Sequence, residues 1–145
     1  MVYSPTGLLL TKSFEQCRLV PYQDLGNKGI WTNGWGNTHG VVPNGPAIMQ
    51  AQADADLQHN VMSATYGVNH YVAVRLSQNE FDALVDFVYN VGVGNFAAST
   101  MLRKVNCGDF TGAATEFERW DMAGGVHLAG LLRRRVAEQG EFTEA

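Results

Sequence analysis

Two carboxylic acids near the start of the chain could together cleave a glycosidic bond. That reaction needs a proton donor for the leaving oxygen and, on the opposite side of the sugar, a group that holds water or stabilises the sugar cation. Glu15 and Asp24 are nine residues apart on different expected elements, and the Thr32 hydroxyl could hold a water. By spacing alone, the commoner interpretations are a solvated helix position for Glu15 and a turn for Asp24.

The elements that must position these residues begin with a helix from Pro5 to about Arg18, with Ser4 as its N-cap. From residue 21 to residue 45, glycines recur between apolar residues, which predicts short strands and turns. The stretch from about 47 to 68 has a helical composition with two apolar stripes, so it could bridge two lobes. The stripes are Ile48, Ala51, Ala55 and Met62 on one side, and Leu57, Val61, Ala64 and Val68 on the other.

The second half of the chain carries clearer helix signals. Ser77 and Glu80 have the spacing of a capping box, for a helix that ends near Asn90. Further helices are expected from about 99 to 106, from an Asp109 cap to Trp120 with Trp120 in the core, and from about 128 to 139.

These elements predict a mainly helical α+β fold in one domain of 145 residues, a length that can bury a core. A small hairpin lobe is expected at about 19–46 and a bridging helix at about 47–68. A larger helical lobe is expected from about 1–18 plus 69–145, with a substrate cleft between the lobes.

Composition limits the binding partners that the protein is expected to have and the cellular compartment in which it is expected to be stored. The net charge of −4, without a basic stripe, disfavours nucleic-acid binding and gives no long-range attraction to an anionic cell wall. The apolar run at 7–10 is too short for a signal sequence or a membrane span, which predicts storage in the cytoplasm of the producing cell. Cys17 and Cys107 are expected to be reduced and buried or half-buried. The four histidines lack zinc-ligand spacing, so no metal or other cofactor is expected.

Several motifs follow one another along almost the whole chain. Ser13–Leu19 and Pro21–Asp24 combine phenylalanine-glutamate, arginine-leucine and tyrosine-x-aspartate, and Gly29–Gly36 is rich in glycine and aromatic residues. Later motifs occupy residues 78–84, 90–94, 99–102, 106–109, 120–125 and 130–138. In this order and spacing they resemble the phage lysozymes (endolysins) of glycoside hydrolase family 24.

The resemblance implies a lysozyme-like fold and a muramidase. Such an enzyme hydrolyses the β-1,4 bond between N-acetylmuramic acid and N-acetylglucosamine in bacterial peptidoglycan and lyses the host cell. It also implies a catalytic triad in which Glu15 protonates the leaving oxygen while Asp24 and Thr32 position a water, so that the anomeric carbon is inverted. Thr32 follows Asp24 by eight positions where six are usual, and Asn27 and Lys28 are interpreted as an insertion in the turn.

Further site residues have two interpretations each. Trp31 and Trp35 could stack on sugar rings, or one of them could pack under the sheet. Tyr89 and Asn90 could contact sugar or terminate a helix. Asn37 stands where the resemblance often has a histidine.

A basic run near the C-terminus adds two supporting candidates. Arg134 or Arg135 stands where the resemblance implies an arginine near the catalytic glutamate. The run of residues 133–135 is otherwise interpreted as a mostly solvated face.

Two other functions stay open. A lytic transglycosylase needs only the acid, whereas the presence of Asp24 and Thr32 favours hydrolysis. A non-catalytic wall-binding domain with the same fold would not need Glu15, which is present. As an endolysin, the chain is expected to be a monomer that depends on a holin. It would stay in the host cytoplasm until the membrane is permeabilised and then act on the cell wall from the periplasm.

Overall fold

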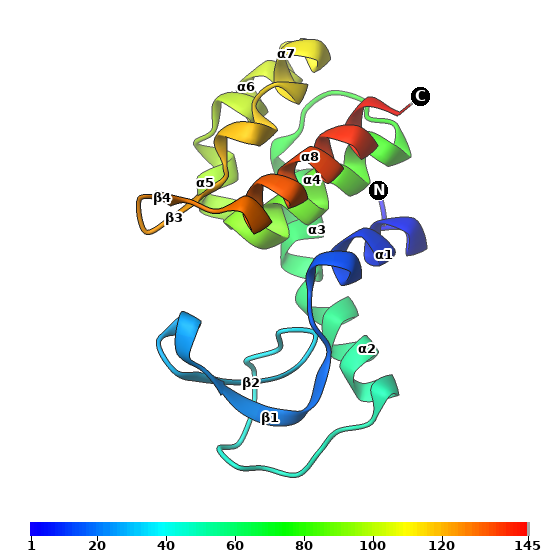
Figure 1. Cartoon of the computed structure of the whole chain (residues 1–145). Helices are drawn as coiled ribbons and strands as arrows, with labels where there is room; N and C mark the ends of the chain where they lie inside the picture. Colours follow the sequence, from blue (N-terminus) through cyan, green and yellow to red (C-terminus); the bar gives the residue numbers. More distant parts are fainter. Residues whose placement is uncertain (145) are drawn as a thin grey trace. The chain divides into compact units, whose positions relative to one another are not determined.

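The chain divides into two compact units in the computed structural model, which describes residues 1–144 (Figure 1). The first unit comprises Met1–Leu10 and the residues from Ser63 onwards, and the second comprises Thr11–Met62. The fold is α+β, as the sequence predicts. In chain order the elements are α1 (Pro5–Phe14), β1 (Arg18–Asp24), η1 (Leu25–Asn27), β2 (Ile30–Gly34), α2 (Gln50–Asn60), α3 (Met62–Tyr71), α4 (Gln78–Val91), α5 (Val93–Ala97), α6 (Thr100–Asn106), α7 (Phe110–Ala114), η2 (Phe117–Arg119), β3 (Met122–Ala123), β4 (Val126–His127) and α8 (Ala129–Thr143).

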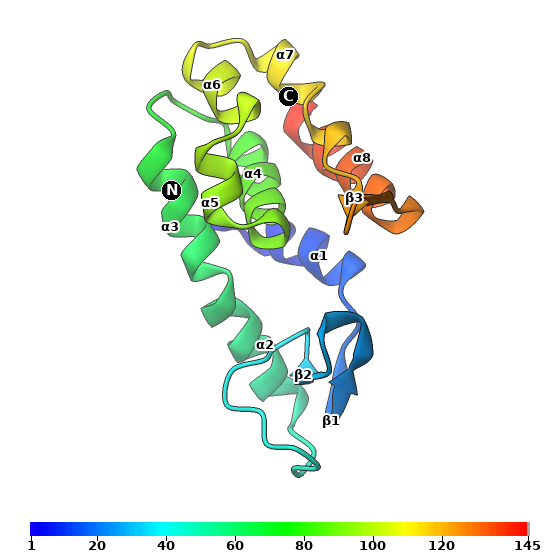
Figure 2. The same ribbon diagram turned by 90° about the vertical axis from the view of Figure 1, so that its left-hand side faces the viewer.

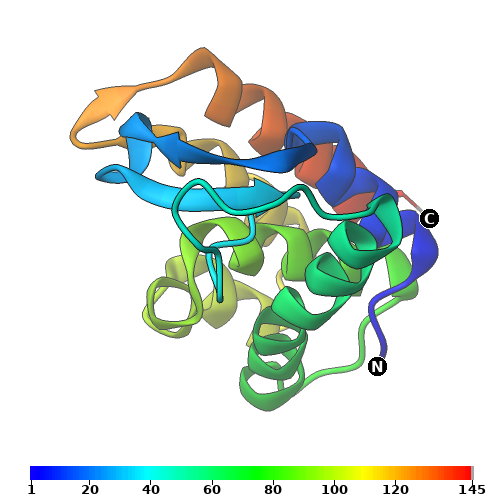
Figure 3. The ribbon, with the colours of Figure 1, turned by 90° about the horizontal axis from the view of Figure 1, so that it is seen from below.

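The second unit contains the predicted hairpin, in which β1 and β2 run antiparallel (Figure 3). Tyr22 pairs with Thr32 and Asp24 pairs with Ile30, whereas the register shifts between Arg18 and Tyr22. Proline cannot donate a ladder hydrogen bond and is confined to edges and irregular stretches of sheets. The proline of β1 lies within the shifted stretch, which is consistent with this rule.

The turn of the hairpin accommodates the two extra residues that the sequence indicated. Asn27 ends η1, and Lys28 and Gly29 follow with left-handed backbones at φ 55° and 72°. The Asp24 carboxylate caps η1 by accepting a hydrogen bond from the Gly26 backbone N–H at 3.1 Å. Asn27 and Lys28 therefore lengthen the turn and leave the pairing of the strands intact.

Helix α2 packs closely on the end of β2. An ideal Cβ at Gly34 would lie 3.2 Å from the Ala53 Cβ and 3.3 Å from its Cα, and Gly34 has a φ of +54°. A glycine without a Cβ meets both demands. Nearby, the Ile48 N–H donates to the Leu19 carbonyl at 2.9 Å, which ties the segment before α2 to β1.

The prediction of one bridging helix at about 47–68 is wrong in two respects, its bounds and its buried faces. The helix begins at Gln50 and is interrupted at Val61, where α2 ends and α3 begins. The second predicted stripe is buried throughout, with Leu57, Val61, Ala64 and Val68 at most 4% exposed. The first stripe is not buried, since Ala51, Ala55 and Met62 are exposed. Alanine is small and favours helices at the surface as well as in the core, so its spacing did not indicate burial.

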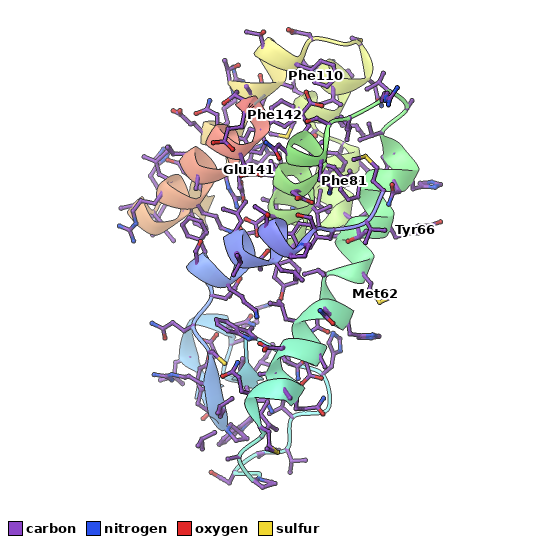
Figure 4. All side chains as sticks on the ribbon, turned by 90° about the vertical axis from the view of Figure 1, so that its right-hand side faces the viewer. Met62, Tyr66, Phe81, Phe110, Glu141 and Phe142 are labelled. Atoms are coloured by element: carbon purple, nitrogen blue, oxygen red, sulfur yellow. The ribbon has the colours of Figure 1, made fainter. Side chains whose placement is uncertain are left out.

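The first unit is organised around α4, where the Ser77–Glu80 capping box is confirmed and every residue from Phe81 to Val88 is buried. Helix α8 packs along α4, and α5, α6 and α7 follow one another beside them (Figure 2). Phe87 makes edge contacts with Phe96, Phe117 and Trp120, with ring centroids 5.4–6.4 Å apart. The pair of Phe110 and Phe142 extends this aromatic core (Figure 4).

The N-terminal helix begins as predicted but ends earlier. Ser4 caps α1 by accepting a hydrogen bond from the Gly7 N–H at 3.1 Å, and its hydroxyl also donates to Asp82. The helix ends at Phe14 and not at the expected Arg18, where β1 begins.

Other boundaries also differ from the sequence-based expectations. The helix predicted from an Asp109 cap to Trp120 is divided into α7 and η2, and the last helix extends to Thr143. Helix α5 and the β3–β4 hairpin were not predicted, because elements of two to five residues are too short to show a periodicity. Across residues 1–144, no helix is both long enough and apolar enough to cross a membrane.

Candidate active site

Glu15 stands just beyond the C-terminal end of α1. Its backbone N–H still donates to the Thr11 carbonyl at 3.2 Å, which continues the helical turn by one residue. The side chain is half-buried. Gly36 has a φ of +81°, and an ideal Cβ there would lie 3.4 Å from the Glu15 Oε2. The glycine-rich segment after β2 therefore brings its backbone directly against the Glu15 carboxylate.

Asp24 and Thr32 project from the same face of the β1–β2 hairpin. Directly paired residues share a face and successive side chains alternate, so the pairs Asp24–Ile30 and Tyr22–Thr32 place all four on one side. Asp24 and Thr32 are diagonal neighbours, for which Cα atoms are about 7–8 Å apart. The longer turn increases the sequence spacing between Asp24 and Thr32, but both side chains remain on the same face of the hairpin.

The Thr32 hydroxyl has a defined orientation. Thr32 is 2% exposed, and its Oγ1 donates to the Ile30 carbonyl at 3.1 Å. With its proton committed to the backbone, the oxygen keeps lone pairs that can accept a hydrogen bond from a water. Asp24, which is half-buried, accepts from Gly26 through Oδ1 and can use further lone pairs on its two oxygens.

Tyr22 lies in the electrostatic field of both acids. Burial is the main cause that raises its pKa, and the negative charges of Asp24 and Glu15 raise it further, whereas Arg18 lowers it. The Arg18 guanidinium also lies over the Tyr22 ring, 4.4 Å from its centroid. Tyr22 was not singled out as a site residue from the sequence. Its position two residues before Asp24 on a strand was the available signal, because such residues share a face.

Trp31, within β2, and Trp35, directly after β2, have different surroundings. Trp31 pairs with Gln23, so its side chain projects from the opposite face of the hairpin to Asp24 and Thr32. The Trp35 indole N–H donates to the Asp54 carboxylate at 2.8 Å, and the Lys12 ammonium lies 5.2 Å from the Trp35 ring centroid. Both tryptophans are half-buried.

Asn37, at the position where a histidine was expected from the resemblance, belongs to a buried amide network. Its side-chain amide donates to the Asn33 Oδ1 and to the His39 carbonyl, each at 3.1 Å. Its Oδ1 accepts from the Asn60 amide at 3.0 Å and from the His39 backbone N–H at 3.3 Å. Asn37 therefore connects the glycine-rich segment to the end of α2 without a titratable group of its own.

The remaining candidates belong to the first unit. Tyr89 is half-buried and Asn90 is exposed at the end of α4. The interpretation of residues 133–135 as a solvated face is wrong, because Arg134 is 4% exposed and Arg135 is fully buried. Only Arg133 is exposed in this run.

The two buried arginines bind acids of the same unit. Arg134 donates to the Asp86 carboxylate through Nε at 3.0 Å and through Nη2 at 2.9 Å. Arg135 donates to Glu138 at 2.6 Å. Burial raises the pKa of Glu138 well above its usual value, and a hydrogen bond with Asp86 raises it further.

The cysteines form no disulfide in the structure. Both cysteines are free thiols; Cys17 is half-buried, and Cys107 is exposed, contrary to expectation. Within the described part of the chain, no group of three or more histidine, cysteine or acidic side chains could hold a metal ion. The candidate groups of the second unit are the carboxylic acids of Glu15 and Asp24, the Thr32 hydroxyl and the Tyr22 phenol.

Comparison with known proteins identifies relatives along the whole chain. The sequence model of the phage lysozyme family matches residues 12–138. The endolysin of Acyrthosiphon pisum secondary endosymbiont phage 1 is 40% identical over 149 aligned residues, which cover 100% of both proteins. The SAR-endolysin of Enterobacteria phage PA-2 is 34% identical and is matched over 96% of this chain and 81% of its own length.

Solved structures agree with these sequences. The muramidase domain of SpmX from Asticaccaulis excentricus has a TM-score of 0.90 at 36% identity, over 99% of this chain and 98% of its own. The endolysin from Escherichia coli O157:H7 phage FAHEc1 has a TM-score of 0.91 at 34% identity, over 99% and 94%.

Similarity at this level defines the class of the protein as a glycoside hydrolase with the lysozyme fold. Within that class, the chain belongs to the phage lysozyme family. The resemblance noted from the motifs and the lysozyme-like fold that it implied are both confirmed.

Proposed function

We propose that this protein is an endolysin, a muramidase that hydrolyses bacterial peptidoglycan and lyses the host cell, with Glu15 as its general acid. Its membership of the phage lysozyme family supports the reaction class. The observation that carries the residue assignment is the placement of Glu15 against Gly36, with Asp24 and Thr32 on one face of the adjoining hairpin. All three proposed catalytic side chains lie in the second unit.

The proposed reaction cleaves the β-1,4 bond between N-acetylmuramic acid and N-acetylglucosamine. Glu15 donates its proton to the leaving glycosidic oxygen as the bond to the anomeric carbon breaks. A water attacks the opposite face of that carbon and passes a proton to the Asp24 carboxylate. Thr32 accepts a hydrogen bond from this water, because its own hydroxyl proton is directed to the Ile30 carbonyl. The product then has the inverted anomeric configuration.

The other site candidates take secondary roles in this proposal. Trp31 or Trp35 would contact the glycan outside the reacting bond. Tyr89 and Asn90, which belong to the first unit, are proposed separately as glycan contacts. Arg134 and Arg135 would act as supporting groups, and their own hydrogen bonds to Asp86 and Glu138 favour a structural contribution.

The proposal is tested by mass spectrometry of purified peptidoglycan digested with the wild-type protein and with Glu15→Gln. The wild-type digest should contain muropeptides with reducing N-acetylmuramic acid ends, and Glu15→Gln should release none while remaining folded. Glu118→Gln is a matched control, because Glu118 is exposed in the first unit and has no role in the proposed reaction. Normal digestion by Glu15→Gln would overturn the assignment, and anhydro-muramyl ends would identify a lytic transglycosylase instead.

We further propose that the protein acts as a monomer and reaches the wall only after a separate holin permeabilises the inner membrane. The three proposed catalytic residues belong to one chain, which supports action as a monomer. The segment before Glu15 is part of the fold, since Ser4 binds Asp82 and Tyr3 is buried, so its removal would disrupt α1. Expression alone in a Gram-negative host should leave cells intact until chloroform is added, and light scattering should report one chain per particle. Spontaneous lysis would contradict dependence on a holin.

A further inference from the structure

A single carboxylate oxygen on α2 accepts hydrogen bonds from three separate parts of the second unit. The Asp54 Oδ1 accepts from the Trp35 indole N–H at 2.8 Å and from the Lys12 ammonium at 3.1 Å. It also accepts from the Gln50 amide at 3.2 Å. Lys12 comes from the last turn of α1, Trp35 from the glycine-rich segment after β2, and Gln50 from the first turn of α2.

Each of these three donors is linked to a residue next to Glu15 or to a segment that lies against it. Lys12 is three residues before Glu15 on α1. Trp35 directly precedes Gly36, whose backbone lies against the Glu15 carboxylate. The Gln50 amide also contacts the Cys17 sulfur, at 3.6 Å, two residues after Glu15. Asp54 is thus connected to the backbone before, after and opposite the proposed general acid.

We propose that Asp54 is a positioning residue for catalysis, which holds the α1 end and the Trp35–Gly36 backbone in the geometry that aims the Glu15 carboxyl group. This inference rests on the proposed role of Glu15. Asp54 does not contact the reacting atoms itself, and it acts through Lys12, Trp35 and Gln50. The Lys12 ammonium over the Trp35 ring adds a second tie between the same two segments.

We expect Asp54 to contribute more to the reaction rate than to the stability of the fold. The Asp54 side chain is 42% exposed and that of Lys12 is 28% exposed, so the ion pair is screened by water and adds little to folding. A displacement of a catalytic group by about 1 Å can lower the rate roughly 100-fold. Hydrogen bonds from Trp35, and then from Lys12 and Gln50, lower the pKa of Asp54, which favours its charged form.

The test compares Asp54→Asn with Asp56→Asn. Asp56 is a matched control on the same helix, because its carboxylate accepts a hydrogen bond from Gln52 at 2.8 Å just as Asp54 accepts from Gln50. We expect Asp54→Asn to lower kcat on soluble glycan chains roughly ten-fold, with unchanged KM and the melting temperature of Asp56→Asn. Asp54→Glu, which keeps the charge, should recover part of the kcat.

A spectroscopic readout tests the network independently of activity. The Trp35 indole N–H resonance should move in Asp54→Asn and stay in place in Asp56→Asn. Glu15→Gln measured alongside separates the two proposals. Full activity of Glu15→Gln would overturn the proposed function. An inactive Glu15→Gln with an undiminished kcat for Asp54→Asn, or equal kcat losses in both aspartate variants, would overturn the positioning role alone.

Discussion

Replacement of Arg134 by methionine should destabilise the first unit strongly. The Arg134 side chain is 5% exposed, and it donates two hydrogen bonds to Asp86, whose side chain is fully buried. Methionine keeps much of the side-chain volume but removes both charge-assisted hydrogen bonds. The cost of breaking a buried ion pair at one partner is about 3–5 kcal/mol, because the remaining charge stays in the interior.

That cost is large relative to the stability of a domain, which is typically about 5–15 kcal/mol. At roughly 2–4 °C per kcal/mol for a domain near this size, the melting temperature should fall by about 6–20 °C. Urea denaturation followed by circular dichroism measures the free energy of unfolding directly, and differential scanning calorimetry measures the melting temperature.

Two further variants make this reasoning refutable. Arg133→Met changes the neighbouring residue, which is exposed, and should alter the unfolding free energy by less than about 0.5 kcal/mol. Arg134→Met combined with Asp86→Asn removes the remaining charge and should recover at least half of the loss. Equal stabilities of the Arg133 and Arg134 variants, or no recovery in the double variant, would show that the buried pair is not what stabilises this region.

Three more predictions concern the pH dependence of stability, the role of Thr32 and the stereochemistry of the reaction. Burial and a hydrogen bond with Asp86 raise the pKa of Glu138 in the folded state, so its contribution to stability is full below its unfolded pKa and is lost as the pH rises through the raised folded pKa. Urea midpoints should therefore fall less between pH 5 and pH 8 in Glu138→Gln than in the wild type or in Glu118→Gln, and parallel pH profiles would contradict this. Thr32→Val, which removes the hydroxyl with little change in volume, should lower kcat roughly ten- to 100-fold. A proton NMR time course of the wild-type reaction should show the inverted anomer first, and a retained anomer would exclude the role of Asp24 as a base for water.

Signals in the sequence were reliable where they depend on neighbouring residues. The Ser4 cap and the Ser77–Glu80 capping box require only groups within one helical turn, and both form as predicted. The resemblance also indicated the longer hairpin turn, because Thr32 follows Asp24 by eight positions where six are usual in the family. Strand parity then places both residues on one face, because the pairing of β1 with β2 is local in the chain.

Features that depend on distant partners needed the tertiary structure. The sequence shows three consecutive arginines, but only packing against α4 decides that Arg134 and Arg135 are buried with Asp86 and Glu138 while Arg133 is exposed. The place of Asp54 beside Lys12 and Trp35 likewise depends on how α2 packs on the hairpin. Local propensities act along the chain, whereas burial and charge pairing depend on which segments meet in space. The sequence alone therefore determined the family, the fold class and the candidate acids. The tertiary structure decided which side chains are buried and which partners they bind.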